Sequence, residues 1–178
     1  MNICVFCSAN ERLDADFYAM AEALGRWIAA EGHTLVFGGN DSGLMHSVSL
    51  GAHEGGGRVV GVVPRLIEQR GKLSPYLDVH IPTETLSDRK DLMELRSDAF
   101  VVLPGGIGTL DELFSMASAQ GLGYHSKPII LYNMKGFWDS LIRMMDDLEA
   151  KGVIRGHWRE SLLVAQSLDD VGEFLQRQ

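Results

Sequence analysis

Short runs of hydrophobic residues alternate along the chain with longer segments in which hydrophobic positions recur every three or four residues. The short runs are rich in β-branched residues and rarely alternate with polar positions, which is typical of strands covered on both faces of a parallel sheet. They predict strands over Ile3–Phe6, Thr34–Phe37, Val59–Val63, Asp78–Ile81, Phe100–Leu103, Ile129–Tyr132 and Leu162–Val164.

The longer segments predict helices, because their hydrophobic residues recur at the spacing that one helix face requires. The predicted helices span Ala15–Glu31, Gly43–Glu54, Ser87–Ser97, Thr109–Gln120, Gly136–Lys151 and Leu168–Gln176. Since strands and helices alternate throughout, the pattern predicts an α/β fold: a doubly wound parallel sheet with helices on both faces.

No linker, low-complexity segment or block of like charges divides the 178 residues, and this length is sufficient to bury a full core. We therefore expect a single domain over residues 1–178. The segment Arg65–Pro75 is expected to be the most irregular surface loop.

Composition and charge narrow the class of protein. The 46% hydrophobic and 22% charged content is ordinary for a globular protein, and the net charge of -8 argues against a nucleic-acid polymer as partner. No apolar run approaches the roughly 20 residues of a membrane span, and residues 1–7 lack the basic region of a signal peptide. We expect no membrane partner and a cytoplasmic location.

Cysteine and histidine spacing gives little support to metal or redox chemistry. Cys4 and Cys7 form a C-x-x-C pair within or at the end of a predicted strand, where side chains three apart point to opposite faces. This favours structural thiols over the alternative of a redox or metal pair. The six histidines show no ligand spacing, so no catalytic metal is predicted.

Candidate chemistry gathers where predicted strands end, because a doubly wound sheet binds ligands outside the carboxyl ends of its strands. The segments expected there are 7–10, 38–43, 64–65 and 104–109. Two of them are glycine-rich and lead from a strand into a helix, where free N–H groups and the helix dipole favour an anion. Neither matches a dinucleotide or Walker fingerprint, so they indicate a phosphorylated small molecule without indicating NAD or ATP.

Two charged groups accompany these loops, and each has two interpretations. Thr109 and Glu112 form T-x-x-E, which is either a helix capping box or a carboxylate placed beside a bound anion. Arg89-Lys90 is either the cationic side of a phosphate site or a solvated pair balanced by the aspartates that flank it. The spacing of 23 positions between Arg89 and Glu112 leaves open whether they meet.

Several motifs follow one another in a fixed order along nearly the whole chain. They are Cys4-Val5-Phe6-Cys7-Ser8, Val36-Phe37-Gly38-Gly39 with Ser42-Gly43-Leu44-Met45, Val60-Gly61-Val62-Val63-Pro64, Arg89-Lys90-x-x-Met93, and Pro104-Gly105-Gly106-Ile107-Gly108-Thr109-x-x-Glu112. Together they resemble the LONELY GUY (LOG) family of cytokinin riboside 5′-monophosphate phosphoribohydrolases. The last motif with its upstream arginine and lysine is the most specific part of the resemblance.

The resemblance implies a Rossmann-like fold, a homodimer and a hydrolase acting on N-glycosyl bonds. Such enzymes cleave a nucleoside 5′-monophosphate into free base and ribose 5-phosphate, without a metal or redox cofactor. Arg89 and Glu112 would be the catalytic residues. The implied substrate-binding residues are Ser8, Gly38, Gly39, Gly43, Lys90, Gly105, Gly106, Ile107, Gly108, Thr109 and Asp111.

The chain departs from the family pattern at several positions, so base specificity does not follow from the resemblance. These positions are Asn40, His46, Leu86, Asp111 and Ala117. A cytokinin nucleotide, AMP and another purine monophosphate all stay open as substrates.

Two other functions stay open as well. A non-catalytic nucleotide-binding or carrier protein of the same fold is the main alternative. Lysine decarboxylase, a label that some family members carry, requires a lysine that forms a Schiff base with pyridoxal phosphate. None of the lysines in the chain lies in a recognisable sequence context for that cofactor.

Overall fold

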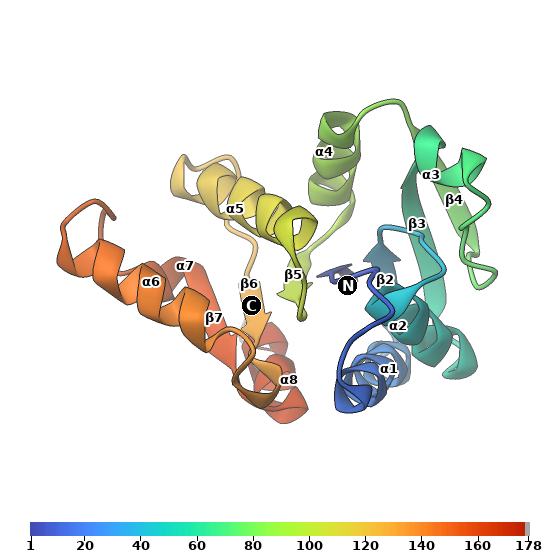
Figure 1. Cartoon of the computed structure of the whole chain (residues 1–178), viewed down its shortest axis with the longest axis horizontal. Coiled ribbons are helices and arrows are strands. Elements are labelled where there is room, and N and C mark those ends of the chain that lie inside the picture. Colours follow the sequence, from blue (N-terminus) through green and yellow to red (C-terminus); the bar gives the residue numbers. More distant parts are fainter. Residues whose placement is uncertain (177–178) are drawn as a thin grey trace.

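Seven parallel strands form one sheet in the order β4-β3-β2-β1-β5-β6-β7 (Figure 1). The computed structural model describes residues 1–176. The strands are β1 (Asn2–Phe6), β2 (Thr34–Phe37), β3 (Arg58–Pro64), β4 (Val79–Thr83), β5 (Ala99–Val102), β6 (Ile129–Tyr132) and β7 (Leu162–Ala165). Each predicted strand is present, with its ends within two residues of the prediction.

Helices pack on both faces of this sheet, which confirms the doubly wound α/β prediction. They are α1 (Ala15–Ala30), α2 (Gly43–Glu54), α3 (Arg65–Gln69), α4 (Leu86–Arg96), α5 (Ile107–Gly121), α6 (Asp139–Ala150), α7 (Trp158–Ser161) and α8 (Leu168–Gln176), with a 3₁₀ turn at Met134–Gly136. Helices α1, α2 and α8 cover one face, and α4 to α7 cover the other. No helix within residues 1–176 is long and apolar enough to cross a membrane.

The two faces of the sheet bury two separate cores, and the cysteines are divided between them. Cys7 lies in the core beneath α1, α2 and α8, whereas Cys4 lies in the core on the opposite face. Both thiols are free, and burial raises the pKa of each well above its ordinary value. Neutral buried thiols on opposite faces support the interpretation of the pair as structural.

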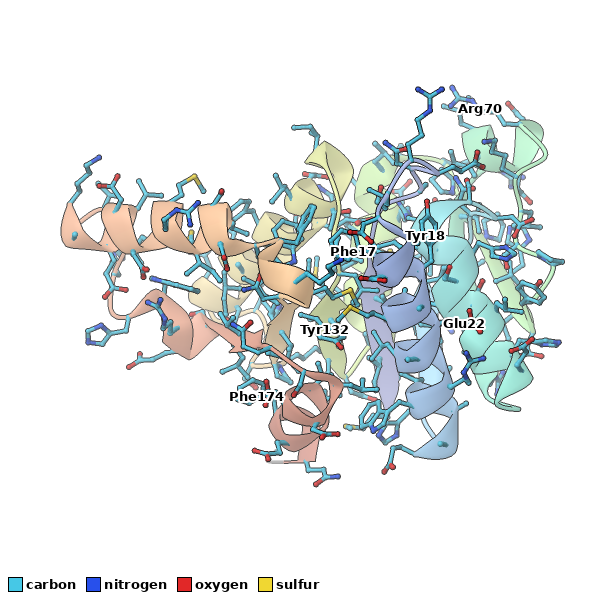
Figure 2. All side chains as sticks on the ribbon, turned by 60° about the horizontal axis from the view of Figure 1, so that its bottom comes forward. Phe17, Tyr18, Glu22, Arg70, Tyr132 and Phe174 are labelled. Carbon is cyan, nitrogen blue, oxygen red and sulfur yellow. The ribbon has the colours of Figure 1, made fainter. Side chains whose placement is uncertain are left out.

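Helices α1 and α2 cross at close range because each carries a glycine at the contact. A side chain on Gly25 would overlap the backbone carbonyl of Val48, and one on Gly51 would overlap that of Glu22. Figure 2 shows Phe17, Tyr18 and Glu22 along α1, beside α2. This crossing fixes the N-terminus of α2 beneath the carboxyl ends of the central strands.

The predicted helix Gly136–Lys151 begins later than expected, because the chain turns sharply before it. Lys135 has φ 52° and Gly136 has φ 74°, which are left-handed values that interrupt a helix. Asn133 stabilises the turn, since its side-chain oxygen accepts a 2.7 Å hydrogen bond from the N–H of Trp138. Helix α6 then starts at Asp139.

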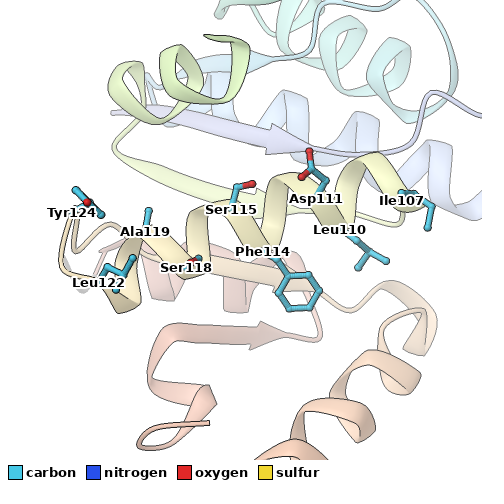
Figure 3. A pocket seen from close by; sticks show the side chains of 9 residues that line it. All are labelled: Ile107, Leu110, Asp111, Phe114, Ser115, Ser118, Ala119, Leu122 and Tyr124. Carbon is cyan, nitrogen blue, oxygen red and sulfur yellow. The ribbon is translucent and has the colours of Figure 1, made fainter. Parts of the chain in front are cut away.

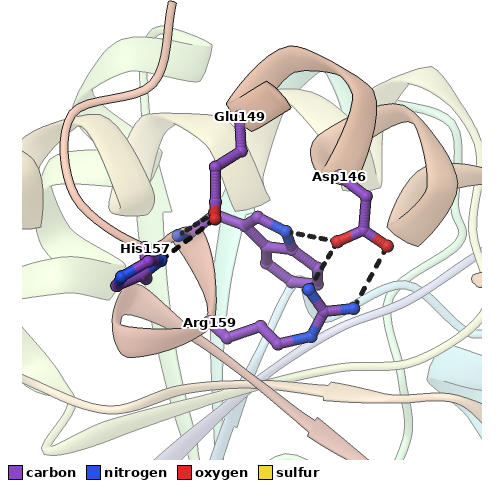
Figure 4. Close-up of polar contacts among 5 residues, drawn as sticks. Asp146, Glu149, His157 and Arg159 are labelled. Atoms are coloured by element: carbon purple, nitrogen blue, oxygen red, sulfur yellow. Dashed lines mark hydrogen bonds and ion pairs between the residues drawn. The ribbon is translucent and has the colours of Figure 1, made fainter. Parts of the chain in front are cut away.

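Two short helices, α3 and α7, were not predicted. Helix α3 falls inside the segment expected to be an irregular loop. Helix α7 is tied to α6 by side chains: Asp146 pairs with Arg159, and Glu149 accepts 3.0 Å hydrogen bonds from His157 and from the N–H of Trp158 (Figure 4). These contacts are tertiary, so a four-residue helix of this kind carries no periodic sequence signal.

Candidate active site

The candidate site lies where the direction of strand connection reverses. From β1 the chain builds β2, β3 and β4 on one side, and then returns to place β5 on the other side of β1. Loops leave such a point in opposite directions and open a crevice. Two hydrogen bonds join the loops here: Ser8 N–H donates to Pro104 (3.0 Å), and Leu44 N–H donates to Ser8 (2.9 Å).

A cavity of about 280 Å³ opens at this point. Its lining includes both predicted catalytic residues, Arg89 and Glu112, and a subset of the predicted binding residues. The full lining is Cys7, Ser8, Ala9, Met45, Arg89, Gly106, Gly108, Thr109 and Glu112. The sequence did not single out Cys7, Ala9 or Met45 as substrate-binding residues. Their only signal was position: the first two flank Ser8, and Met45 follows Gly43-Leu44 in a motif.

Arg89 and Glu112 meet directly in this cavity. The Nη1 atom of Arg89 lies 3.2 Å from Oε1 of Glu112, and the two side chains are only 13% and 7% exposed. The Nε atom of Arg89 donates a 3.2 Å hydrogen bond to the carbonyl of Val62, which fixes the guanidinium at the end of β3. Arg89 is therefore a buried partner of Glu112, and the interpretation as a solvated surface residue is wrong.

Glycines of the β2–α2 loop allow this arrangement. A side chain on Gly38 would overlap the guanidinium of Arg89, so only glycine lets Arg89 extend past the end of β2. Gly43 has φ 58°, and a Cβ atom there would lie 2.6 Å from the backbone of Ala9 and Asn10. Gly38, Gly39 and Gly43 do not line the cavity themselves. Gly38 and Gly43 instead let the residues that line it pack closely. The contact with substrate expected of all three glycines stays a prediction.

Helix α5 begins two residues before Thr109, and this overturns the capping-box interpretation. Its N-cap is Gly106, which makes no side-chain cap, and Thr109 is the third residue of the helix. Leu110 is the residue whose N–H donates back to Gly106 (3.0 Å), so the N–H groups of residues 107–109 have no acceptor within the helix. Glu112 accordingly lies in the second turn and does not cap the helix.

The start of α5 offers both donors and space to an anion. Apart from the adjacent residues and the backbone of α5 itself, no atom lies within 4 Å of where a Cβ atom of Gly106 or Gly108 would be, although both residues line the cavity. Gly105, by contrast, packs tightly against the side chain of Thr109. Free N–H groups at a helix N-terminus beside open space form a favourable site for a phosphate.

Burial raises the pKa of Glu112 to about 7, against the opposing effect of the Arg89 charge. Asp111 raises this pKa further and Lys90 lowers it, both to a smaller extent than burial. A carboxyl group with such a pKa gains or loses a proton near neutral pH, which suits it for proton transfer or for charge stabilisation.

Four other predicted binding residues lie outside the cavity lining, and Gly105 is one of them. The Nζ atom of Lys90 lies 2.9 Å from both carboxylate oxygens of Asp111 and donates a 3.0 Å hydrogen bond to Ser115. Ile107 is 84% exposed on the outer side of α5. The substrate contacts expected of Gly105, Lys90, Asp111 and Ile107 stay predictions.

The outer side of α5 carries an exposed hydrophobic surface around an open hollow of about 710 Å³ (Figure 3). Ile107, Leu110 and Phe114 contribute side chains along the helix, and Leu122 and Tyr124 contribute them at its end. Leu122 and Tyr124 are 75% and 79% exposed. A surface of this kind is typical of a contact with another protein chain.

Comparison with known proteins places the chain among relatives of similar length. A family model described as "Possible lysine decarboxylase" matches residues 45–175. A Mycobacterium tuberculosis protein named cytokinin riboside 5′-monophosphate phosphoribohydrolase is 38% identical over 168 residues, covering 94% of this chain and 89% of that protein. The Arabidopsis thaliana protein named cytokinin riboside 5′-monophosphate phosphoribohydrolase LOG2 is 32% identical over 174 residues, covering 98% and 82%.

Solved structures with the same fold include proteins described as binding or carrying a molybdenum cofactor. The molybdenum cofactor binding protein from Rippkaea orientalis superposes with a TM-score of 0.76 at 25% identity, covering 99% of this chain and 95% of that one. The Moco carrier protein from Chlamydomonas reinhardtii gives a TM-score of 0.76 at 26% identity, with the same coverage.

Proposed function

Because the chain belongs to the LONELY GUY family of cytokinin riboside 5′-monophosphate phosphoribohydrolases, we propose that it hydrolyses the N-glycosidic bond of a nucleoside 5′-monophosphate. The products are the free base and ribose 5-phosphate. The observation that carries this proposal is the buried Arg89–Glu112 pair, which shares one cavity with the N-terminus of α5. An anion site beside a carboxyl group titrating near pH 7 is the chemistry that such a reaction requires.

The 5′-phosphate binds at the start of α5. Support comes from the N–H groups of Gly108 and Thr109, which have no acceptor within the helix, and from the open space beside Gly106 and Gly108. The Thr109 hydroxyl and Ser8 complete the polar lining. Holding the non-reacting phosphate here positions the ribose at Glu112, so that binding energy is used to orient the reacting bond.

Glu112 acts on the ribose or on the attacking water. As water attacks C1′, the bond from C1′ to the base nitrogen breaks, and its electron pair leaves with the base, which takes up a proton. The ribose passes through a state that resembles an oxocarbenium ion, which an ionised carboxylate stabilises. Arg89 binds and orients the nucleotide, and its charge favours the ionised form of Glu112.

A panel of nucleotides tests the reaction and the base specificity together. AMP, GMP, IMP, CMP and isopentenyl-AMP are incubated with the protein, and free base is measured by chromatography. We expect base release from at least one purine monophosphate and none from adenosine, which lacks the phosphate. Thermal stabilisation by these nucleotides without any base release would support the carrier alternative, in line with the similarity to molybdenum cofactor carriers.

Lysine decarboxylation is not supported, despite the description of the family model. That activity needs a lysine in the cavity to hold pyridoxal phosphate as a Schiff base. The described residues that line the cavity include no lysine. Lys90 and Lys135 are instead paired with aspartates, and Lys127 donates to the carbonyl of Glu94.

A homodimer is part of the same proposal, and a cytoplasmic location stays a prediction. The exposed hydrophobic surface of α5 supports a second copy of the chain as the partner, because it lies directly outside the helix that carries Glu112. Light scattering would then give twice the chain mass, and Leu122→Lys would shift the protein toward monomer. A monomeric wild-type protein would contradict this part of the proposal.

A further inference from the structure

Two consecutive residues of α4 pair with two consecutive residues of α5. Arg89 pairs with Glu112 inside the cavity, and Lys90 pairs with Asp111 outside it. The inner side chains are 13% and 7% exposed, whereas those of Lys90 and Asp111 are 20% and 52% exposed. The two ion pairs therefore lie side by side, one buried and one at the surface.

Lys90 directs its ammonium group at side chains of α5. An ammonium group has three N–H donors. The acceptors available to Lys90 are the two carboxylate oxygens of Asp111, each at 2.9 Å, and the hydroxyl of Ser115 at 3.0 Å. Asp111 and Ser115 project from the same side of α5 (Figure 3). The ammonium group of Lys90 is therefore held at α5 by both residues.

The position of α4 relative to α5 decides whether the inner pair can form. Arg89 extends from α4 and Glu112 from α5, so a small shift between these helices separates their charged groups. Lys90 directly follows Arg89 along the chain, and Asp111 directly precedes Glu112. The ion pair between Lys90 and Asp111 therefore fixes α4 relative to α5 next to the Arg89–Glu112 pair.

We infer that Lys90 and Asp111 are positioning residues: together they hold α4 against α5 and balance the charge next to the Arg89–Glu112 pair. This inference rests on the proposed function, since it concerns the same site. It gives Lys90 and Asp111 a role different from the substrate contact that the family resemblance implies. Neither residue touches the reacting atoms.

The charge balance has a measurable consequence for Glu112. Arg89 and Lys90 face it from α4 and lower its pKa, while Asp111 on its own helix raises it. The thiol of Cys7 lines the same cavity as Glu112, and Cys4 lies in the core on the other face of β1. Burial, with the charge of Glu112, raises the pKa values of both thiols so far that they stay neutral. Removing one member of the outer pair leaves the charge of the other uncompensated.

Two single variants test the inference because they act in opposite directions. Lys90→Met leaves the Asp111 charge uncompensated and should move the midpoint of the kcat–pH profile up. Asp111→Asn leaves the Lys90 charge uncompensated and should move it down. Each shift should be roughly 0.5 pH unit, as Coulomb's law gives for a charge several ångströms away in a partly solvated setting. The double variant should return the midpoint toward that of wild type.

A matched control uses an exposed ion pair at the C-terminal end of α6, in which Nζ of Lys151 lies 2.6 Å from Oδ2 of Asp147. Lys151→Met and Asp147→Asn make the same charge changes away from the cavity and should leave the midpoint where it is. A common shift in all four variants would overturn the inference, as would shifts of the same sign in Lys90→Met and Asp111→Asn. An effect of Lys90→Met on KM alone would also overturn it, because it indicates substrate binding.

A second readout separates this inference from the proposed function. The carboxyl carbon of Glu112 can be titrated by ¹³C NMR without any turnover, and Glu112→Gln assigns its signal. Opposite shifts of that titration in Lys90→Met and Asp111→Asn support the inference even if no nucleotide is hydrolysed. An unchanged Glu112 titration in both variants overturns it even if the protein is an active hydrolase.

Discussion

The guanidinium of Arg89 lies 3.2 Å from the carboxylate of Glu112, although the two residues come from different helices. Burial removes both groups from water, and the pKa of Glu112 rises to about 7 in spite of the adjacent positive charge. Desolvation thus outweighs the attraction within the pair. The ionised form of Glu112 therefore costs folding free energy in this position. A carboxyl group held at such a cost is typical of a catalytic site.

Glu112→Gln should therefore lose less stability than wild type as pH rises. Because the pKa of Glu112 is raised in the folded state, the folded protein binds more protons than the unfolded chain between about pH 4.5 and 7. Wild-type stability falls as pH rises through this window, and the variant lacks that loss. Between pH 4 and pH 8 the free energy of unfolding of the variant should gain up to about 3 kcal/mol relative to that of wild type. Urea unfolding at pH 4 and pH 8 measures the difference.

The control for this experiment is Glu11→Gln, which changes an exposed glutamate. Its effect on the free energy of unfolding should be small at both pH values. A stability difference between Glu112→Gln and wild type that does not change with pH would contradict the account.

Gly38→Ala should impair activity with little effect on stability. The added methyl group would overlap the end of the Arg89 side chain, which is flexible and can move away. Arg89 would then leave Glu112, and misplacement of a catalytic group by about 1 Å costs about 10²-fold in rate. We expect a fall in kcat/KM of about 10- to 100-fold and a melting temperature close to that of wild type. Gly121→Ala, whose Cβ atom meets nothing within 4 Å, is the matched control.

Gly51→Ala should have the opposite outcome. Its methyl group would overlap the backbone carbonyl of Glu22 at the crossing of α1 and α2, where no flexible side chain can move away. Overpacking of this kind costs about 1–3 kcal/mol. Denaturant unfolding measures the loss, and a stability equal to that of Gly121→Ala would show that the two helices are free to separate.

Gly108→Ala tests the phosphate site at the start of α5. The Cβ atom would occupy open space in the cavity lining, so the fold should tolerate it and helix propensity should improve slightly. Ribose 5-phosphate should raise the melting temperature of wild type, while adenosine should not. The variant should bind ribose 5-phosphate about tenfold more weakly, a loss of about 1.4 kcal/mol. Equal binding by wild type and variant would place the phosphate elsewhere.

Continuous β-branched runs made the sheet predictable from sequence. Thr34–Phe37 and Ile129–Tyr132 are strands with the predicted ends, and α2 and α8 have the predicted bounds. The late start of α6 was not predictable, because it depends on the left-handed conformation of a lysine, Lys135. The predicted start of α5 at Thr109 was two residues late, because the T-x-x-E spacing suggested Thr109 as the N-cap, whereas the N-cap is Gly106.

The chemistry of the site was predictable in kind but not in arrangement. Motif resemblance identified Arg89 and Glu112, yet only the packing of α4 on α5 brings them together. The pairing of Lys90 with Asp111 has the same tertiary origin. Met45 lines the cavity because α2 starts at the same edge of the sheet. Nothing in the residue type of a methionine predicts that position.

The most direct test of the central claim compares base release by wild type and Glu112→Gln. Both proteins are incubated with the purine monophosphate that the panel identifies, and the free base is measured by chromatography while nucleotide binding is followed by thermal shift. The account predicts base release by wild type, and no base release by the variant with nucleotide binding largely retained. Full activity of Glu112→Gln would contradict the assignment of Glu112 as the catalytic carboxylate.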